Sequence, residues 1–414
     1  MSRTPPANDL PDLDVTPDFD VTDDELRAGG AVKWTLPAPG VLPAWVAEMD
    51  VRPCPAVQEA LRDALDRGAY GYPAPDAATG LPDATAEFLL RRFGWRVEPH
   101  RVVLTGDVMA GVRLVLERVC EGAPVVVPVP SYPPFLDVVP LTGRQLVTVA
   151  CVRGNGPDGA PRDVLDLDAI DAALARGART VIISSPYNPL GRAFGRAELE
   201  GLRDVLVRRG ARVISDEIHA PLVLPGATHI PYLSLDGTAE HATAVVGSSK
   251  AWNTPGLKCA QIVAGSAADL VALRGAPLVA NHGVASLGIV AALAAYTRGE
   301  AWLDGGLAHL DRMRALLGTL LDRYLPHVSC PPLEATYLAW LDASATGLAD
   351  PTRTALDAGR VMLFPGSHFG PGYEHFTRLN IATSAERLER VVSQLATAWP
   401  PAAPAASPPA SPPK

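Results

Sequence analysis

The 414-residue sequence lacks the features that mark several large classes of protein. No uninterrupted apolar run is long enough to span a bilayer, and the acidic start MSRTPPANDLPDLD does not have the form of a signal peptide. The five cysteines are scattered without a CxxC pair, which argues against a disulfide framework and favours a reducing, cytoplasmic location. No set of His, Cys or acidic residues has metal-ligand spacing, so no metal site is expected. The net charge of -9 argues against nucleic acid or an anionic membrane as the main partner.

What the sequence has is a regular alternation of strand-like and helix-like segments. Apolar residues make up 48% of the chain, enough for two globular cores. Short apolar runs such as TVIISSP and ARVISDE alternate with helical patterns such as RAELEGLRDVLVRRG, which predicts an α/β fold with a mostly parallel, doubly covered sheet. From about residue 300 the pattern changes to a smaller α+β arrangement. Residues 1–24 are expected to form an arm or to be disordered, and 400–414 an extended Pro/Ala/Ser-rich tail.

Chemically useful residues follow four of the predicted strands. They are the turn Gly106–Met109 after RVVLT, Asn188 after TVIISSP, Asp216 after ARVIS, and Lys250 after HATAVVG. Ligands of open α/β sheets bind beyond the carboxyl ends of the strands, so these residues are expected to converge on one edge. A lysine there loses hydration, which lowers its pKa and makes the neutral amine accessible.

This set of groups matches the needs of one cofactor. A helix N-terminus after a glycine turn binds phosphate, a neutral lysine amine forms an imine, and a buried carboxylate can hold a heterocyclic nitrogen protonated. An asparagine amide can donate to a phenolate oxygen. The sequence therefore predicts a site for pyridoxal 5'-phosphate.

Longer stretches carry a resemblance to a known family. They are LPAWVAEMD, AYGYP, VPVPSYPPF, SSPYNPLGRAF, VISDEIHAPLVLPGATHIPY, SSKAWNTPGLK, TYLAWLD and FPGSHFG…HFTRLNIAT. Over about residues 30–398 the chain resembles fold-type I pyridoxal-phosphate enzymes, specifically the carbon–sulfur β-lyases of the MalY and PatB cystathionine β-lyase type. The resemblance implies a large, mostly parallel seven-stranded sheet domain at 61–300, a small α+β domain at 301–399, and a segment at 25–60 that joins the small domain.

The resemblance also implies roles for individual residues. Lys250 is expected to bind the cofactor covalently and to move the substrate Cα proton, and Tyr132 to stack on the ring and aid proton transfer. Arg378 is expected to clamp the substrate carboxylate. The remaining cofactor contacts implied are Asp216 to the ring nitrogen, Asn188 and His219 near the ring oxygen, and Val108, Met109, Ser248, Ser249, Lys258 and Tyr72 to the phosphate. Tyr72 would come from the partner of a homodimer, and Asn188 and the backbone near Val46 and Ala47 would also border the substrate.

The reaction implied is β-elimination from L-cystathionine or another L-cysteine S-conjugate. Transamination is the alternative, because it uses the same lysine, aspartate and arginine, and a non-catalytic pyridoxal-fold regulator is a third. Three residues depart from the family pattern. Asp107 stands where a small neutral residue is usual, Gly247 where serine is frequent, and Lys258 where many aminotransferases have arginine. His219 could instead support a neighbouring residue, and Tyr72 could lie in the core.

Overall fold

The computed structural model describes residues 16–155, 159 and 161–402, and a seven-stranded sheet forms its centre. The strand order is β2-β10-β9-β8-β7-β3-β4. Strands β9, β8, β7, β3 and β4 are parallel, and β10 runs antiparallel to both of its neighbours. The bounds are β2 Val102–Thr105, β3 Val125–Val129, β4 Leu146–Ala150, β7 Thr180–Ser184, β8 Arg212–Asp216, β9 Ala242–Val246 and β10 Ala260–Ala264. The expected mostly parallel seven-stranded sheet is confirmed.

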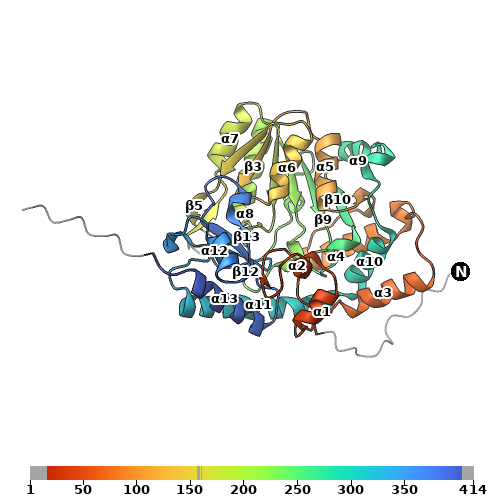
Figure 1. The fold of residues 1–414 in the computed structure, drawn as a ribbon. Helices are drawn as coiled ribbons and strands as arrows, with labels where there is room; N and C mark the ends of the chain where they lie inside the picture. Colours follow the sequence, from red (N-terminus) through yellow and green to blue (C-terminus); the bar gives the residue numbers. More distant parts are fainter. Residues whose placement is uncertain (1–15, 156–158, 160, 403–414) are drawn as a thin grey trace, which may run out of the picture.

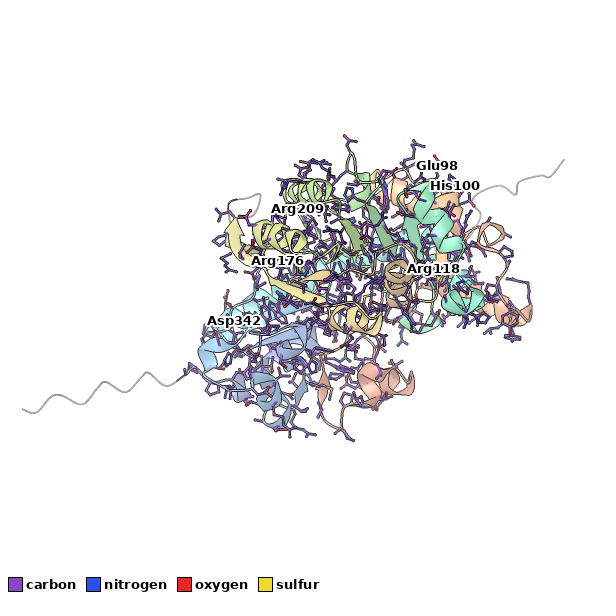
Figure 2. All side chains as sticks on the ribbon, turned by 90° about the horizontal axis from the view of Figure 1, so that it is seen from above. Glu98, His100, Arg118, Arg176, Arg209 and Asp342 are labelled. Atoms are coloured by element: carbon purple, nitrogen blue, oxygen red, sulfur yellow. The ribbon has the colours of Figure 1, made fainter. Side chains whose placement is uncertain are left out.

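Helices cover both faces of this sheet, which explains why its strands are apolar on both sides. In β3, Val125 and Val127 pack into one core with helices α5, α6 and α9, whereas Val126 faces α7 and α8. The bounds are α5 Val108–Arg118, α6 Pro133–Leu141, α7 Leu167–Ala175, α8 Arg196–Arg209 and α9 Ala267–Arg274. Figure 2 shows Arg176 and Arg209, at the ends of α7 and α8, to the left of Arg118, at the end of α5.

A second group of helices packs around the β2 edge. The buried side chains of α3 Pro55–Asp66, α4 Leu81–Phe93 and α10 Ser286–Arg298 form one core with residues of β2, β9 and β10. Helix α4 has Asp83 in its first turn and arginines in its last turn, a charge order that complements the helix dipole. Its end at Gly94 adopts the left-handed conformation that glycine allows.

The C-terminal elements gather beside the sheet, at the lower left of Figure 1. A three-stranded antiparallel sheet has the order β11-β14-β13, and the long helix α11 packs against α13. The bounds are α11 Glu300–Tyr324, β11 Leu338–Asp342, α12 Pro351–Asp357, β13 Phe364–Pro365, β14 Phe376–Asn380 and α13 Ala385–Ala398. Strand β14 pairs with β11 along its whole length, from Phe376 opposite Asp342 to Asn380 opposite Leu338.

The N-terminal segment contacts these C-terminal elements. Strand β1, Leu42–Pro43, pairs in parallel with β12, Val361–Met362. The segment also holds helices α1 Asp23–Ala28 and α2 Val32–Thr35, and a separate hairpin joins β5 Val152–Asn155 to β6 Pro161–Val164. The division into domains at residues 60, 300 and 399 stays a prediction. Most of the expected arm and tail, residues 1–15 and 403–414, lies outside the described residues.

Candidate active site

Lys250 follows β9 and lies in a poorly hydrated position. Its Nζ donates a hydrogen bond to the Ala47 carbonyl at 3.0 Å. Burial, and then the positive charge of Arg378, lower the pKa of Lys250 to about 8. A minor fraction of the amine is therefore neutral near physiological pH, far more than for an ordinary lysine, and the neutral amine is the form that attacks a carbonyl carbon.

The carbonyl that receives Lys250 belongs to a main-chain segment, Trp45–Met49, that side chains from distant parts of the sequence hold in place. Asn380 donates to the carbonyls of Val46 and Glu48, both at 2.7 Å. The other contacts are Arg378 to Trp45 O, Tyr337 to Ala47 O, Lys33 to Glu48 O, and Asn253 to both the N–H and the carbonyl of Met49.

Asp216 ends β8 with a carboxylate that is 3% exposed. Its Oδ1 accepts the Ile218 N–H at 3.0 Å. Burial raises the pKa of Asp216 to about 7, partly offset by the Ile218 N–H and increased by the charge of neighbouring Glu217. A carboxylate in this state is stabilised by a cationic partner, such as a protonated ring nitrogen.

Glu217 anchors the end of β8. Its buried carboxylate accepts hydrogen bonds from the Ser215 hydroxyl and the Tyr232 N–H, each at 2.9 Å, and lies 3.1 Å from Nε2 of His229. Its own N–H donates to the carbonyl of Val245 in β9. This network, which includes His229, fixes the strand end that carries Asp216.

Arg378 reaches the same cavity from β14. Its guanidinium donates to Asn188 Oδ1 and to the Trp45 carbonyl, both at 3.1 Å, and its Nε has no hydrogen-bond partner among the described residues. The group packs over the rings of Phe364 and Phe369 at 4.8 and 5.2 Å. Burial lowers the pKa of Arg378 to about 10, so it stays charged and suits a carboxylate.

Tyr132 and His219 form further walls of the cavity. Tyr132 precedes α6, and burial and then the charge of Asp216 raise the pKa of its phenol. Burial, together with the charges of Lys250 and Arg378, lowers the pKa of His219 to about 3, so its imidazole is neutral. Nδ1 of His219 is buried without a hydrogen-bond partner among the described residues, and a ligand atom could satisfy it.

The N-terminus of α5 opens onto this cavity and carries the unexpected residue Asp107. Asp107 caps the helix, because its Oδ1 accepts the N–H of Ala110 at 2.8 Å. Its Oδ2 accepts from Nζ of Lys258 at 2.8 Å. The Asp107 carboxylate is therefore paired both with the Lys258 ammonium and with the N-terminus of α5.

The predicted residues mostly meet in one cavity of about 370 Å³. Two of them do not line it: Ser248 is buried beside it, and Tyr72 lies in a different cleft and is 88% exposed, which rules out a core position within this chain. The predicted residues that line the cavity are Val46, Ala47, Val108, Met109, Tyr132, Asn188, Asp216, His219, Ser249, Lys250, Lys258 and Arg378.

Sequence reasoning did not assign several residues of the cavity wall. Ser184, Ile218 and Phe364 also line it. Ser184 is the last residue of the predicted strand TVIIS, and Ile218 lies between Asp216 and His219, so the strand-end argument could have included both. Phe364 had no such signal, because only the packing of β13 against β14 places its ring beside Arg378.

The described residues contain neither a cluster of metal-ligand side chains nor a helix suited to a membrane. No group of three or more His, Cys, Asp or Glu side chains is arranged to hold a metal ion in this part of the chain. Within the same residues, no helix has both the length and the apolar character needed to cross a membrane.

Comparison with known proteins places these features in a family. Residues 46–395 match the model of aminotransferase class I and II. The chain is 37% identical over 377 residues to a cystathionine β-lyase of Corynebacterium glutamicum, covering 90% of this chain and 98% of that protein. It is 33% identical over 366 residues to the cystathionine β-lyase PatB of Bacillus subtilis, with 86% and 92% covered.

A solved structure agrees with these sequence matches. A protein from Corynebacterium diphtheriae, provisionally described as a PLP-dependent β-cystathionase, has 35% identity and a TM-score of 0.84, covering 91% of this chain and 98% of that one. The fold, the lysine site and the sequence matches along most of the chain agree with one another. The chain belongs to the class I and II aminotransferase family, among the relatives named cystathionine β-lyase.

Proposed function

We propose that the protein is a pyridoxal-phosphate-dependent carbon–sulfur β-lyase. Its substrate would be L-cystathionine or another S-conjugate of L-cysteine. The observation that carries the proposal is one cavity that contains the low-pKa amine of Lys250, the buried carboxylate of Asp216 and the buried guanidinium of Arg378. The relatives named cystathionine β-lyase support elimination as the reaction.

The residues present fit the cofactor. The raised pKa of Asp216 calls for a cation such as a protonated pyridine nitrogen, and the unpartnered Nδ1 of His219 and the amide of Asn188 suit a ring oxygen. When bound, pyridoxal phosphate would link to an amine and act as an electron sink. The residues assigned to it are Lys250, Asp216, Asn188, His219 and Tyr132 around the ring, and Val108, Met109, Ser249 and Lys258 at the phosphate, whereas the expected contact of Ser248 has no support because Ser248 does not line the cavity.

Arg378 and Lys250 perform the first half of the reaction. Arg378 receives the substrate α-carboxylate, with its guanidinium held in orientation by Asn188 Oδ1 and the Trp45 carbonyl. The Trp45–Met49 segment borders the same carboxylate. The Lys250 amine then takes the proton from Cα as a general base, for which its pKa of about 8 is well placed.

The second half is the departure of sulfur. The Cβ–S bond breaks with its electron pair on sulfur, and the thiolate needs a proton. The Lys250 ammonium, formed when the amine takes the Cα proton, has a pKa of about 8 and can return this proton to sulfur. Burial raises the pKa of the Tyr132 phenol, so Tyr132 stays protonated and can relay the proton without losing its own. With one water, L-cystathionine gives homocysteine, pyruvate and ammonia.

The test measures products without an added keto acid. Purified protein loaded with pyridoxal phosphate is incubated with L-cystathionine, and pyruvate and free thiol are quantified. Equal amounts of both are expected, and none with Lys250→Ala. Turnover that requires a keto acid, and yields an amino acid from it, would instead assign an aminotransferase. Full activity of Lys250→Ala would contradict the role of the lysine.

We also infer a homodimer in which Tyr72 contacts the partner's cofactor. Tyr70 and Tyr72 are 71% and 88% exposed, and they border a cleft of about 1080 Å³ with Leu278 and His282. Leu278 and Val279 are 76% and 88% exposed, and a concentration of exposed large apolar residues is typical of a protein interface.

A cytoplasmic location is inferred as well, since five unpaired cysteines suit a reducing compartment.

A further inference from the structure

Asp107 and Lys258 form an ion pair at the end of the cavity assigned to the cofactor's phosphate. The carboxylate has two partners, the N–H of Ala110 through Oδ1 and Nζ of Lys258 through Oδ2, both at 2.8 Å. Both side chains line the same cavity as Lys250. A negative group therefore lies at the helix N-terminus that would otherwise attract an anion most strongly.

Lys258 is the cation that this end of the cavity offers to a phosphate. Among the described residues that line the cavity, the lysines and arginines are Lys250, Lys258 and Arg378. Lys250 is assigned to the covalent link with the cofactor. Arg378 extends from β14 and binds Asn188 and the Trp45 carbonyl. The charge of Lys258 is thus the one that Asp107 and a phosphate would have to share.

The backbone around the pair has little freedom to rearrange. A Cβ at Gly106 would lie 2.8 Å from the carbonyl oxygen of Gly283, so these two chain segments are in direct contact. Lys258 adopts a left-handed backbone conformation with φ 51°, and its carbonyl accepts the N–H of Ala285 at 3.1 Å. The side chains of Asp107 and Lys258 are 40% and 55% exposed, so any adjustment to a phosphate falls to them.

We propose that Asp107 competes with the cofactor's phosphate for the ammonium group of Lys258 and thereby weakens cofactor binding. A carboxylate and a phosphate dianion repel each other, and one ammonium cannot pair fully with both. The affinity for pyridoxal phosphate is then lower than it would be if Lys258 and the helix N-terminus acted without Asp107. Weaker binding favours exchange of the cofactor. The inference rests on the proposed cofactor and not on the lyase reaction.

The test measures cofactor affinity directly. Cofactor-free protein is titrated with pyridoxal phosphate, and in parallel with pyridoxal, which lacks the phosphate, by quenching of tryptophan fluorescence. Asp107→Asn removes the charge but keeps a good N-cap. The dissociation constant for pyridoxal phosphate is expected to fall about fivefold, the upper range for an exposed ion pair. The constant for pyridoxal should not change.

Two further variants locate the effect. Glu117→Gln is the matched control: it removes one carboxylate from an exposed ion pair with Arg113, at the other end of α5, and should not change affinity. Lys258→Gln should weaken binding of pyridoxal phosphate, and adding Asp107→Asn to it should give a smaller gain than in the unsubstituted protein, because only the direct repulsion between carboxylate and phosphate is then removed.

Three results would overturn the proposal. They are an unchanged or weaker affinity in Asp107→Asn, an equal gain for pyridoxal, and a gain in the Lys258→Gln background as large as in the unsubstituted protein. If the unsubstituted protein binds no pyridoxal phosphate, the cofactor assignment fails and the competition fails with it. Lyase activity does not enter the measurement, so a different reaction would leave the inference intact.

Discussion

At the scale of single residues, the site combines charged groups that are costly to bury. Lys250, Asp216 and Arg378 all have pKa values shifted toward the neutral form, mainly by burial. Folding places them in a cavity where a ligand with a carboxylate and a cationic ring can compensate them. We therefore expect the protein without cofactor to be less stable than its packing alone would allow.

Replacing Lys250 tests this expectation. The folded protein lowers the Lys250 pKa from 10.5 to about 8. Between these pH values the unfolded chain binds more protons than the folded chain. The loss of stability caused by burying Lys250 is therefore greatest below pH 8 and disappears as the pH rises toward 10.5. Cofactor-free Lys250→Met should be more stable than the unsubstituted protein at pH 7, by up to about 3 kcal/mol, and less so at pH 9.5.

Urea unfolding at the two pH values measures the difference. Lys258→Met is the control, because it removes a lysine that is 55% exposed. An equal gain in the free energy of unfolding for Lys258→Met, or a gain for Lys250→Met that does not depend on pH, would mean that burial of Lys250 does not destabilise the protein.

Replacing Arg378 tests its contact with the substrate. Arg378→Ala should lower kcat/KM for an amino-acid substrate, with a loss of transition-state stabilisation of roughly 2–4 kcal/mol, because a buried charge-assisted contact is lost. Most of the effect should appear in KM. Arg378→Lys keeps the charge but not the planar group and should lie in between. Steady-state kinetics separate KM from kcat.

The control for Arg378 is a second buried arginine. Arg192 pairs with Glu198 and packs 4.7 Å over Phe194, but it does not line the cavity. Arg192→Lys should leave KM unchanged. If its KM rises as much as that of Arg378→Lys, the loss reflects general disturbance of the fold.

Strand ends made part of the site predictable. Asn188, Asp216 and Lys250 each follow an apolar run, and the order of parallel strands brings them together. Arg378 comes from a different sheet, so only family resemblance pointed to it. The orientation of Asp107 could not be predicted, since it depends on Lys258, 151 positions away.

At the scale of elements, a buried ion pair anchors the N-terminal segment. Lys33, in α2, and Asp50 are each 1% exposed and lie 2.8 Å apart, and Trp34 Nε1 donates to the same carboxylate at 2.7 Å. Lys33 also donates to the Glu48 carbonyl. The pair therefore connects α2 to the segment that borders the active site.

Asp50→Ala should destabilise the protein by about 3–5 kcal/mol, because it leaves a buried ammonium without its partner. Chemical denaturation measures the free energy of unfolding. Asp18→Ala is the control: it breaks an ion pair with Arg52 whose side chains are 50% and 46% exposed, and about 0–1 kcal/mol is expected. Similar losses in both variants would contradict an anchoring role for Asp50.

In the seven-stranded sheet, the strands with continuous apolar runs were predictable and two others were not. The sequence pattern identified β2, β3, β7, β8 and β9. It did not identify β4, at the sheet edge and only partly buried, or β10, the antiparallel strand after the Lys258 turn. Their pairing is decided by tertiary contacts, which override local pattern.

At the scale of the whole molecule, the exposed apolar residues near Tyr72 predict association. Val279→Asp should shift the protein toward its monomer mass of 43.5 kDa in sedimentation and reduce activity, since a charge is placed in the inferred interface. Val207→Asp, at a valine that is 59% exposed on α8, is the control and should not change the mass. A monomer without any substitution would contradict the homodimer.

The Trp45–Met49 segment has a consequence for how such enzymes diverge. Arg378, Asn380, Lys250 and Asn253 all bind its main-chain atoms. These hydrogen bonds depend on the path of the backbone and not on the side chains of the segment, although Ala47 and Met49 also pack in the core and Trp45 donates to the Lys33 carbonyl. Val46 lines the cavity and is only partly buried, so it is the position of this segment where substitution should change substrate preference before it disturbs the geometry at the lysine.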